Sequence, residues 1–488
     1  MAAPVTSTRL SEAELQEVQE IIHALAIQQG AADGANLTRP AASNAKSTFE
    51  VFAKVRPLLP TETQAVLPGL TTETTLHDDD HATVTALHAA PGHAAIGHFH
   101  GVLGTTSTNA NVFSAAIDTR LDVALAGGTL SVFCYGHTGA GKTYTMLGKP
   151  GLEPGLYSLL TDQLLARLDD GQALHVRFVE LHNKKVYDLL DDRSECHLRE
   201  NADGEMRIRG HVKLLEDGRV YAMNQRSVLV KNADDAAEVL AVGLAHRAAG
   251  ASSLNDQSSR SHGVLELEIV NDDLIRARDE VAEAEATAIP LGKAAIDRNI
   301  GFWTTSGLVR MDGRTMVLTC DDDEDVDVSD WMDRLRQEAA EIKAAEAASQ
   351  EANQAHDEAR QRERDVIAEA GGAIGGKVLL VDLAGADKDD RDLAKAGTTR
   401  EEKAESIYIN KSLLALQRCI TAIASGVGKP PFRDSTLTRV LAPVLKPASG
   451  RPAASIMVVN VSPSAELAKY TTNSLRYGSL ASSAASKH

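Results

Sequence analysis

The eight residues Gly136–Thr143 constrain the fold of this chain more than any other segment. They match the pattern G-x-x-x-x-G-K-[ST]. The apolar segment 130–135 precedes them and predicts a strand, and a helix is expected directly after them. A glycine turn that only caps a helix would not need Lys142 and Thr143 directly behind it. The segment therefore predicts a loop that wraps a phosphate group.

Each residue type in this loop has a chemical task. Glycines let successive backbone N–H groups point at a β-phosphate, at the start of a helix. We expect Lys142 to neutralise charge on the β- and γ-phosphates and the Thr143 hydroxyl to reach Mg²⁺. The residues that we expect to contact a nucleotide from this loop are Gly136, His137, Thr138, Gly139, Ala140, Gly141, Lys142 and Thr143.

Two further loops are candidates for sensing the γ-phosphate. The polar segment Asn255–His262 carries hydroxyls and a guanidinium just before the alternating strand 263–270. The acid Asp382 ends the apolar strand 378–381 and Gly385 follows it. An acid at the end of a buried strand can hold the water shell of Mg²⁺, and a glycine just beyond can offer its N–H to a γ-phosphate.

The order of predicted elements indicates the fold class. Strands alternate with helices along most of the chain, which predicts an α/β fold of the P-loop NTPase type, with a central, mostly parallel or mixed sheet flanked by helices. The expected strands are 49–55, 130–135, 263–270 and 378–381, and the expected helices are 109–126, 234–249 and 401–424.

Residues 271–376 interrupt this order. Segments 273–288 and 329–370 are charged and alanine-rich, which predicts two long helices, and 300–320 suggests a β-hairpin between them. We interpret the segment as an inserted helical arm, and as a possible surface for a further protein partner. The chain then divides into an N-terminal helix and linker (1–48), a first core part (49–270), the arm (271–376), a second core part (377–480) and a tail (481–488).

The N-terminal segment 11–29 predicts an amphipathic helix with a capping box between Ser11 and Glu14. This helix is expected to pack either on the core or on a partner.

Composition limits the partners. A net charge of −18 argues against general affinity for nucleic acid. No apolar run has the length of a membrane span, the N-terminus lacks a signal-peptide core, and four scattered cysteines are read as reduced thiols, so a cytoplasmic protein is expected. Residues 377–460 differ in charge from the whole chain. They contain 13 basic and 9 acidic residues, which indicates a local surface for an acidic partner.

Taken together, these motifs resemble the kinesin motor domain. The likeness runs from about residue 49 to 480, apart from the arm. Its members are 54–57, 136–143, 186–190, 255–262, 382–387, 409–413, 431–435 and 475–477, in the order of that family along the chain. The resemblance implies a motor fold that binds ATP with Mg²⁺, hydrolyses it and couples hydrolysis to microtubule binding, for movement or depolymerisation. It also implies a place on the cytoskeleton.

The resemblance also implies roles for individual residues. The adenine is expected beside Lys54, Pro57 and Tyr144, and Arg56 is also expected to contact the nucleotide. Ser258 and Ser259 would lie near the nucleotide, with Ser259, Thr143 and Asp382 near Mg²⁺. Gly385 would bond the γ-phosphate, Arg260 would pair with Asp387, and Asn410 would help to place that cluster. The basic residues expected to face tubulin are Lys388, Lys395, Lys403, Lys411, Arg433 and Arg439.

One departure from the family leaves an alternative open. Asp387 stands where the family usually has glutamate and is one methylene shorter, so we expect it to need a local backbone shift to reach Arg260, and we expect slow hydrolysis. The alternative function is a weakly hydrolysing, nucleotide-gated microtubule-binding protein. Direction of movement, cargo and oligomeric state have no signal in these residues.

Overall fold

The structure is a computed structural model. It describes residues 7, 9–31, 47–60, 62, 71–76, 83–88, 95–200, 206–249, 259–312, 315–322, 325–385, 399–425, 429–445 and 451–485. The chain forms two compact units. The first, the arm unit, comprises residues 1–39, 212–222 and 276–366, and the second, the sheet unit, comprises 40–211, 223–275 and 367–488.

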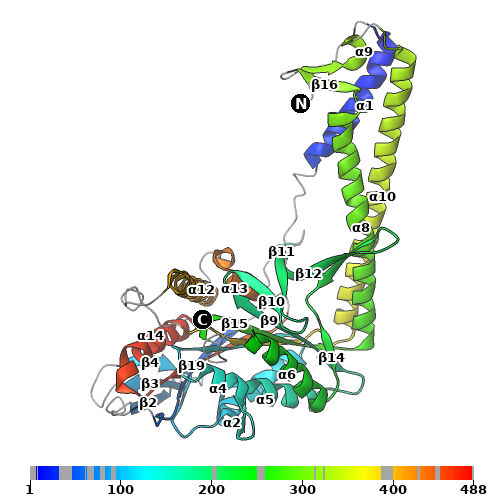
Figure 1. Cartoon of the computed structure of the whole chain (residues 1–488). Helices are drawn as coiled ribbons and strands as arrows, with labels where there is room; N and C mark the ends of the chain where they lie inside the picture. Colours follow the sequence, from blue (N-terminus) through cyan, green and yellow to red (C-terminus); the bar gives the residue numbers. More distant parts are fainter. Residues whose placement is uncertain are drawn as a thin grey trace. The chain divides into compact units, whose positions relative to one another are not determined.

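A mixed sheet forms the centre of the sheet unit, as predicted (Figure 1). Its strands follow the order β11-β10-β9-β15-β18-β6-β19-β1-β5. From β18 to β5 all neighbours are parallel, whereas β15 runs antiparallel to both β9 and β18. The bounds are β1 Ser47–Val55, β5 Gly101–Leu103, β6 Thr129–Tyr135, β9 Ala173–His182, β10 Lys185–Asp188, β11 Ser194–Glu200, β15 His262–Val270, β18 Lys377–Asp382 and β19 Ala453–Val461.

Further strands extend or accompany this sheet. β12 Met206–Leu214 and β13 Val220–Asn224 follow β11, and β14 Val228–Val230 pairs with β9. β2 Thr71–Leu76, β3 Thr83–His88 and β4 Ala95–Phe99 form an antiparallel sheet of their own. β7 Gly148–Lys149 pairs with β8 Glu153–Pro154.

Helices cover both faces of the central sheet because its middle strands are apolar on both sides. Every residue of β19 is buried, and only the first residues of β6 and β18 are half-exposed. Figure 1 shows α4 Lys142–Leu147, α5 Leu156–Leu165 and α6 Ala233–Ala249 on one face. On the other face lie α12 Arg400–Ser425, α13 Thr436–Leu445 and α14 Ala468–Ala485.

The predicted helix 109–126 is divided into four short helical segments. It comprises α2 Asn109–Val112, a π-turn Phe113–Ile117, a 3₁₀ turn Asp118–Arg120 and α3 Leu121–Leu125. One local cause is visible at Asp118, whose carbonyl accepts a bond from the Arg167 guanidinium at 3.3 Å in addition to the tight bond of the 3₁₀ turn.

Tyr477 fixes α14 to the core. Its ring stacks on Tyr135 at the end of β6, with 3.9 Å between centroids. Its hydroxyl donates to the carbonyl of Leu413 in α12 at 3.1 Å. One side chain therefore ties α14 to both the strand that leads into the phosphate loop and to α12.

The arm unit is built on two antiparallel helices, α8 Asp272–Thr305 and α10 Val328–Glu369 (Figure 1). Two ion pairs join the helices in antiparallel alignment. Arg298 pairs with Glu341, and Arg362 pairs with Glu280 at 3.0 Å. The predicted hairpin is β16 Val309–Asp312 with β17 Thr315–Leu318, and a short helix α9, Thr319–Asp322, follows it.

The N-terminal helix α1, Glu12–Ala31, belongs to the arm unit. Its capping box is present, because Ser11 and Glu14 exchange backbone-to-side-chain bonds of 2.8 and 3.3 Å. Its apolar side chains join those of the arm in one core, which contains Val18, Ile22, Leu25, Phe302, Leu308, Val309, Leu318, Cys320, Trp331, Met332, Leu335 and Ile342. The helix therefore packs on the arm.

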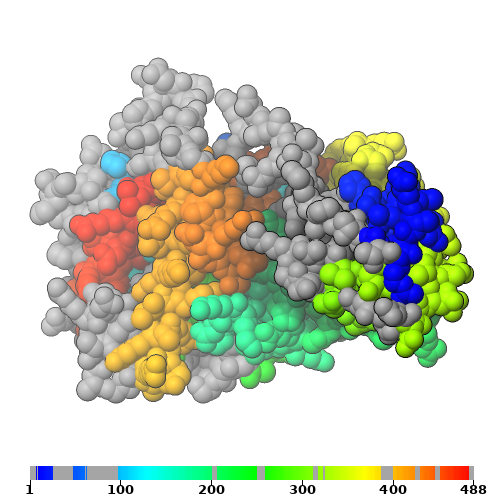
Figure 2. Space-filling view, turned by 90° about the horizontal axis from the view of Figure 1, so that it is seen from above, coloured from blue at the N-terminus to red at the C-terminus, as the bar shows by residue number. Residues whose placement is uncertain are grey.

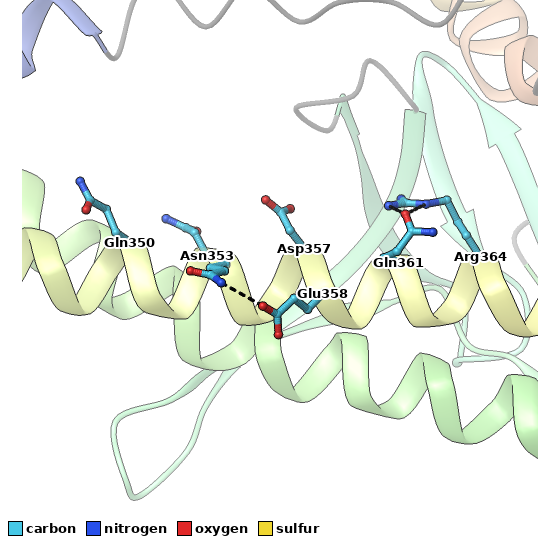
Figure 3. Close-up of a pocket in the computed structure, with 7 residues that line it drawn as sticks. Gln350, Asn353, Asp357, Glu358, Gln361 and Arg364 are labelled. Carbon is cyan, nitrogen blue, oxygen red and sulfur yellow. Dashed lines mark hydrogen bonds between the residues drawn. The ribbon is translucent and has the colours of Figure 1, made fainter.

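One face of α10 is polar from Gln350 to Arg364 (Figure 3). Neighbours along this face bond one another, as Gln354 does with Glu358 at 2.9 Å and Arg364 with Gln361 at 2.7 Å. The face suits water rather than an apolar partner. On α8, in contrast, Ile289, Ile296 and Ile300 share one exposed face, with exposed fractions of 38%, 61% and 50%. The expectation that 271–376 binds a further protein stays a prediction.

The insertion point of the arm follows from strand register. Gly263 of β15 pairs with Asp382 of β18 at the phosphate-loop end, whereas Glu268 pairs with Lys377 five positions away from it. The arm is inserted between the ends of β15 and β18 that lie away from Asp382. The helices that the structure describes include none long and apolar enough to cross a membrane.

Candidate functional site

The phosphate loop connects β6 to α4, as the motif predicts. Gly136, Gly139 and Gly141 have φ values of 151°, 77° and 98°, a region that side chains disfavour. A Cβ atom at Gly136 would also lie 2.3 Å from the carbonyl oxygen of Asn460 in β19. The path of the loop therefore depends on glycine.

Lys142 lies at the centre of this loop and is 5% exposed. Its Nζ donates to the carbonyl oxygens of Gly136 and His137 at 2.9 and 3.0 Å. The ammonium is thus already held over the loop, in the place where the motif needs a cation. Around it, Ala140 and His137 are buried, Thr143 is half-buried, and Thr138 and Gly139 are exposed.

Asp382 ends β18 beside the phosphate loop. Strand pairing places Asp382 opposite Cys134 of β6, and Asp382 is fully buried. Oδ2 accepts a bond from Arg247 Nη1 at 3.0 Å. No donor among the described residues reaches Oδ1, which is also buried. A buried carboxylate oxygen without a donor suits the water shell of a cation, so Asp382 fits the expected Mg²⁺ site.

Arg247 is a site residue that the sequence analysis missed. It comes from the last turn of α6 and is 4% exposed. Its Nη2 donates to the carbonyl of Ser261 at 3.2 Å, and a Cβ atom at Gly263 would lie 2.7 Å from Nη1. The sequence offers no signal for it, because basic residues are common at the C-termini of helices.

Backbone and imidazole bonds connect the two sensing loops to each other and to α12. Gly385 donates its N–H to the carbonyl of Ser259 at 2.8 Å. Ala384 donates its N–H to His262 Nδ1 at 2.9 Å, and His262 Nε2 lies 3.0 Å from the Ser412 hydroxyl of α12. Burial, then the cations Arg247 and Lys142, lowers the pKa of His262 to about 3. The imidazole is therefore neutral and donates from Nε2.

Arg260 bonds directly to α12. Its Nη1 donates to Glu405 and its Nη2 to Glu402, both at 3.1 Å. The predicted pairing of Arg260 with Asp387 lies outside the described residues, as do Ser258, Lys388 and Lys395. Ser259 is half-buried beside Arg260, and Asn410 is exposed on α12.

The residues expected at the adenine divide into buried and exposed ones. Lys54 is 5% exposed, and its Nζ donates to Asn109 at 2.5 Å and to Thr145 at 3.2 Å. Burial lowers the pKa of Lys54. Tyr144 is 39% exposed, and its hydroxyl donates to Glu153. The Lys54 ammonium lies 5.8 Å from the Tyr144 ring centroid, within the range of a cation–π contact.

Arg56 braces the phosphate loop. Its Nε donates to the carbonyl of Gly139 at 2.6 Å, and its guanidinium forms a two-pronged pair with Glu62. The bond from Arg56, with a bond from the Leu59 amide, lowers the pKa of Glu62 to about 2. Pro57 follows as an exposed residue. Glu62 and Asn109 carry no motif, so the sequence analysis did not single them out.

The predicted tubulin-facing residues that the structure describes lie on α12, α13 and the turn before α13. Lys411 is exposed, Lys403 and Arg439 are half-buried, and Arg433 bonds Glu200 at 2.7 Å. Arg439 also lines a cavity of about 230 Å³ with a basic rim that the sequence analysis missed. Its lining residues are Lys184, Lys185, Val186, Glu195, Cys196, His197, Leu198, Arg199, Thr436 and Arg439.

The chain is similar in sequence to kinesin motor domains. The sequence model of the kinesin motor domain matches residues 54–291 and 347–484. The human kinesin-like protein KIF24 is 25% identical over 78% of this chain and 19% of its own length. Kinesin-like protein 3 of Schizosaccharomyces pombe is 24% identical over 80% of this chain and 51% of its own length. The chain thus spans a fifth to a half of these relatives.

Solved structures show the same fold. The structure of a fast kinesin, described with implications for ATPase mechanism and interactions with microtubules, has a TM-score of 0.55 and 21% identity. It covers 90% of this chain and 93% of the other. A structure of kinesin motor ATPase mutants has a TM-score of 0.52, with 89% and 98% covered. With a family match over most of its length and the fold in place, the chain belongs to the kinesin motor domain family.

Proposed function

We propose that this chain binds ATP with Mg²⁺, hydrolyses it and couples hydrolysis to binding a microtubule. The observation that carries the proposal is one continuous set of bonds. It runs from the loop after Asp382, through Ala384 and His262, to Ser412 on α12. A change at the phosphate end of this set can displace α12, and a displacement of α12 can act back on the phosphate end.

The chain's own groups have separate tasks in this proposal. ATP and its Mg²⁺ supply the transferable phosphoryl group and the charge that the site must bind. Lys142 holds positive charge over the phosphate loop, and Asp382 offers a buried acceptor oxygen. The amide of Gly385 now donates to Ser259, so a γ-phosphate would compete with that carbonyl for the same N–H. Loss of this bond would change the position of the Gly385 loop.

The proposed microtubule surface combines charge with apolar contact. Ile407 and Leu414 are 57% and 46% exposed on α12, and Lys411 and Arg418 are exposed on the same side of the helix. Figure 2 shows α12 and α13 side by side on one face, next to the segment of β10 and β11. An acidic partner would be attracted to the basic groups and would cover the apolar ones.

The second candidate is a nucleotide-gated microtubule-binding protein that hydrolyses ATP weakly. It is favoured by Arg260, whose guanidinium bonds two carboxylates of α12. Asp387 adds to this reading, because its side chain is shorter than the glutamate that the family usually has. Both candidates share the nucleotide site and the microtubule surface, and they differ in turnover.

One experiment separates the two candidates. Steady-state ATP hydrolysis is measured with and without microtubules in low salt, for the wild type and for Asp387→Glu, beside co-sedimentation with microtubules. The first candidate predicts a wild-type rate that rises at least about tenfold with microtubules, the scale of ordinary allosteric coupling. Co-sedimentation without a rise in rate supports the second candidate. If the chain shows neither ATP turnover nor co-sedimentation with microtubules, both candidates are overturned.

A further inference from the structure

Among the described residues, the Arg260 guanidinium bonds two carboxylates of α12. The guanidinium donates from Nη1 and Nη2 to two separate carboxylates, each at 3.1 Å. Both carboxylates lie in the first two turns of α12, at Glu402 and Glu405. Two negative groups around one cation leave no net positive charge for a phosphate oxygen. In this arrangement two carboxylates of α12 offset the charge of Arg260.

The two carboxylates are themselves held in place. Glu405 also bonds His182 Nε2, at the end of β9, at 2.6 Å, and its side chain is only 11% exposed. Glu402 uses its other oxygen to accept the Thr399 N–H at 3.0 Å, and the Thr399 hydroxyl accepts the Glu402 N–H at 3.1 Å. This is a capping box, so Glu402 moves with the start of α12. Burial opposes ionisation of Glu405, but the bonds from His182 and Arg260 outweigh it and lower its pKa.

We propose that Glu402 and Glu405 are positioning residues that hold Arg260 away from the nucleotide and keep hydrolysis slow until α12 moves. The inference rests on the proposed function, which makes α12 the element that meets the microtubule. A microtubule that shifts the start of α12 would carry both carboxylates away from Arg260. The guanidinium would then regain a free positive charge beside Ser259 and Gly385.

The test uses glutamine variants of the full chain. Glutamine keeps the length of the side chain and still accepts the capping bond, but it removes the negative charge. Glu402→Gln, Glu405→Gln and the double variant are compared with Glu401→Gln. Glu401 is exposed in the same first turn, so the same charge is lost from α12 with no bond to Arg260 among those described. Thermal unfolding is recorded for all four variants.

The readouts are kcat and KM for ATP without microtubules and the stimulation by microtubules. We expect the double variant to raise kcat without microtubules by about three- to tenfold, the scale for losing two partly exposed ion pairs. The KM for ATP should change little, and the stimulation ratio should fall. Glu401→Gln should behave as the wild type. A merely structural role would lower stability and leave kcat without microtubules unchanged or reduced, and that result overturns the proposal.

We call the hold of Glu402 and Glu405 on Arg260 the latch. Failure of the latch is distinguishable from failure of the proposed function. The proposed function fails in the wild type, when the chain neither hydrolyses ATP nor sediments with microtubules. The latch is judged only by comparing variants. If the wild type hydrolyses no ATP but the double variant does, the latch is supported; if neither hydrolyses ATP, the latch is overturned.

Discussion

Arg247 and Asp382 form an ion pair that is shielded from water. Nη1 and Oδ2 lie 3.0 Å apart, and the two residues are 4% and 0% exposed. The pair joins the end of α6 to the end of β18, beside the phosphate loop. Removing one partner leaves the other charge buried without compensation, which costs more than the pair itself contributes.

Arg247→Met is therefore expected to destabilise the chain by about 3–5 kcal/mol. The measurement is the free energy of unfolding in urea. Arg418→Met is the matched control, because Arg418 is exposed on α12 and a surface change there should stay within about 0.5 kcal/mol. Equal losses of unfolding free energy in the two variants would show that the buried pair contributes no more to stability than an exposed residue does.

Lys142→Ala is expected to reduce ATP turnover by about 100-fold or more, because it removes the cation that lies over the phosphate loop. Binding of a fluorescent ATP analogue and steady-state hydrolysis are the measurements. Lys149→Ala serves as control, since Lys149 is an exposed lysine of β7 just beyond α4. An unchanged turnover in Lys142→Ala would remove the phosphate loop from the mechanism.

Sequence reasoning succeeds where a residue type has a geometric reason to be there. The glycines of the loop have positive φ and Asp382 ends a buried strand, as the motifs require. It fails where a role depends on distant partners. Arg247 lies 135 positions from Asp382, and Glu402 lies 142 positions from Arg260, and neither carries a motif. Only the folded chain brings these charges together.

The same limit applies to the helices. Ser11 and Glu14 predict where α1 begins, because a capping box is local in sequence. The surface on which α1 packs depends on apolar residues such as Trp331 that lie more than 300 positions away. The sequence therefore predicts the helix and leaves its partner open.

Leu414→Ala and Lys411→Ala are expected to weaken microtubule binding in different ways. Loss of the exposed leucine should lower affinity at all salt concentrations, because apolar contact is not screened by ions. Loss of the lysine should lower affinity at low salt and reduce the salt dependence. Co-sedimentation over a salt series measures both. Lys293→Ala on the arm is the control, and a similar loss there would argue against α12 as the binding surface.

His262 is expected to make the chain less stable at mildly acidic pH. Its pKa is about 3 in the folded chain, because of burial and the nearby Arg247 and Lys142, against an ordinary value of 6.5. Between these values the unfolded chain takes up a proton that the folded chain does not. The unfolding free energy therefore falls as pH drops below 6.5, by about 2 kcal/mol at pH 5 from this residue alone, and the loss ends near pH 3.

The measurement is urea unfolding at pH 7 and pH 5 for the wild type and His262→Gln. The variant loses the bonds to Ala384 and Ser412, so it should be less stable at pH 7. Glutamine does not titrate, so the variant should lose less stability between pH 7 and pH 5 than the wild type does. His197→Gln, at an exposed histidine, should keep the wild-type dependence. Equal losses in the wild type and His262→Gln would mean that His262 is not held neutral by the fold, and the bonds that link the Asp382 loop to α12 would then need a charged imidazole.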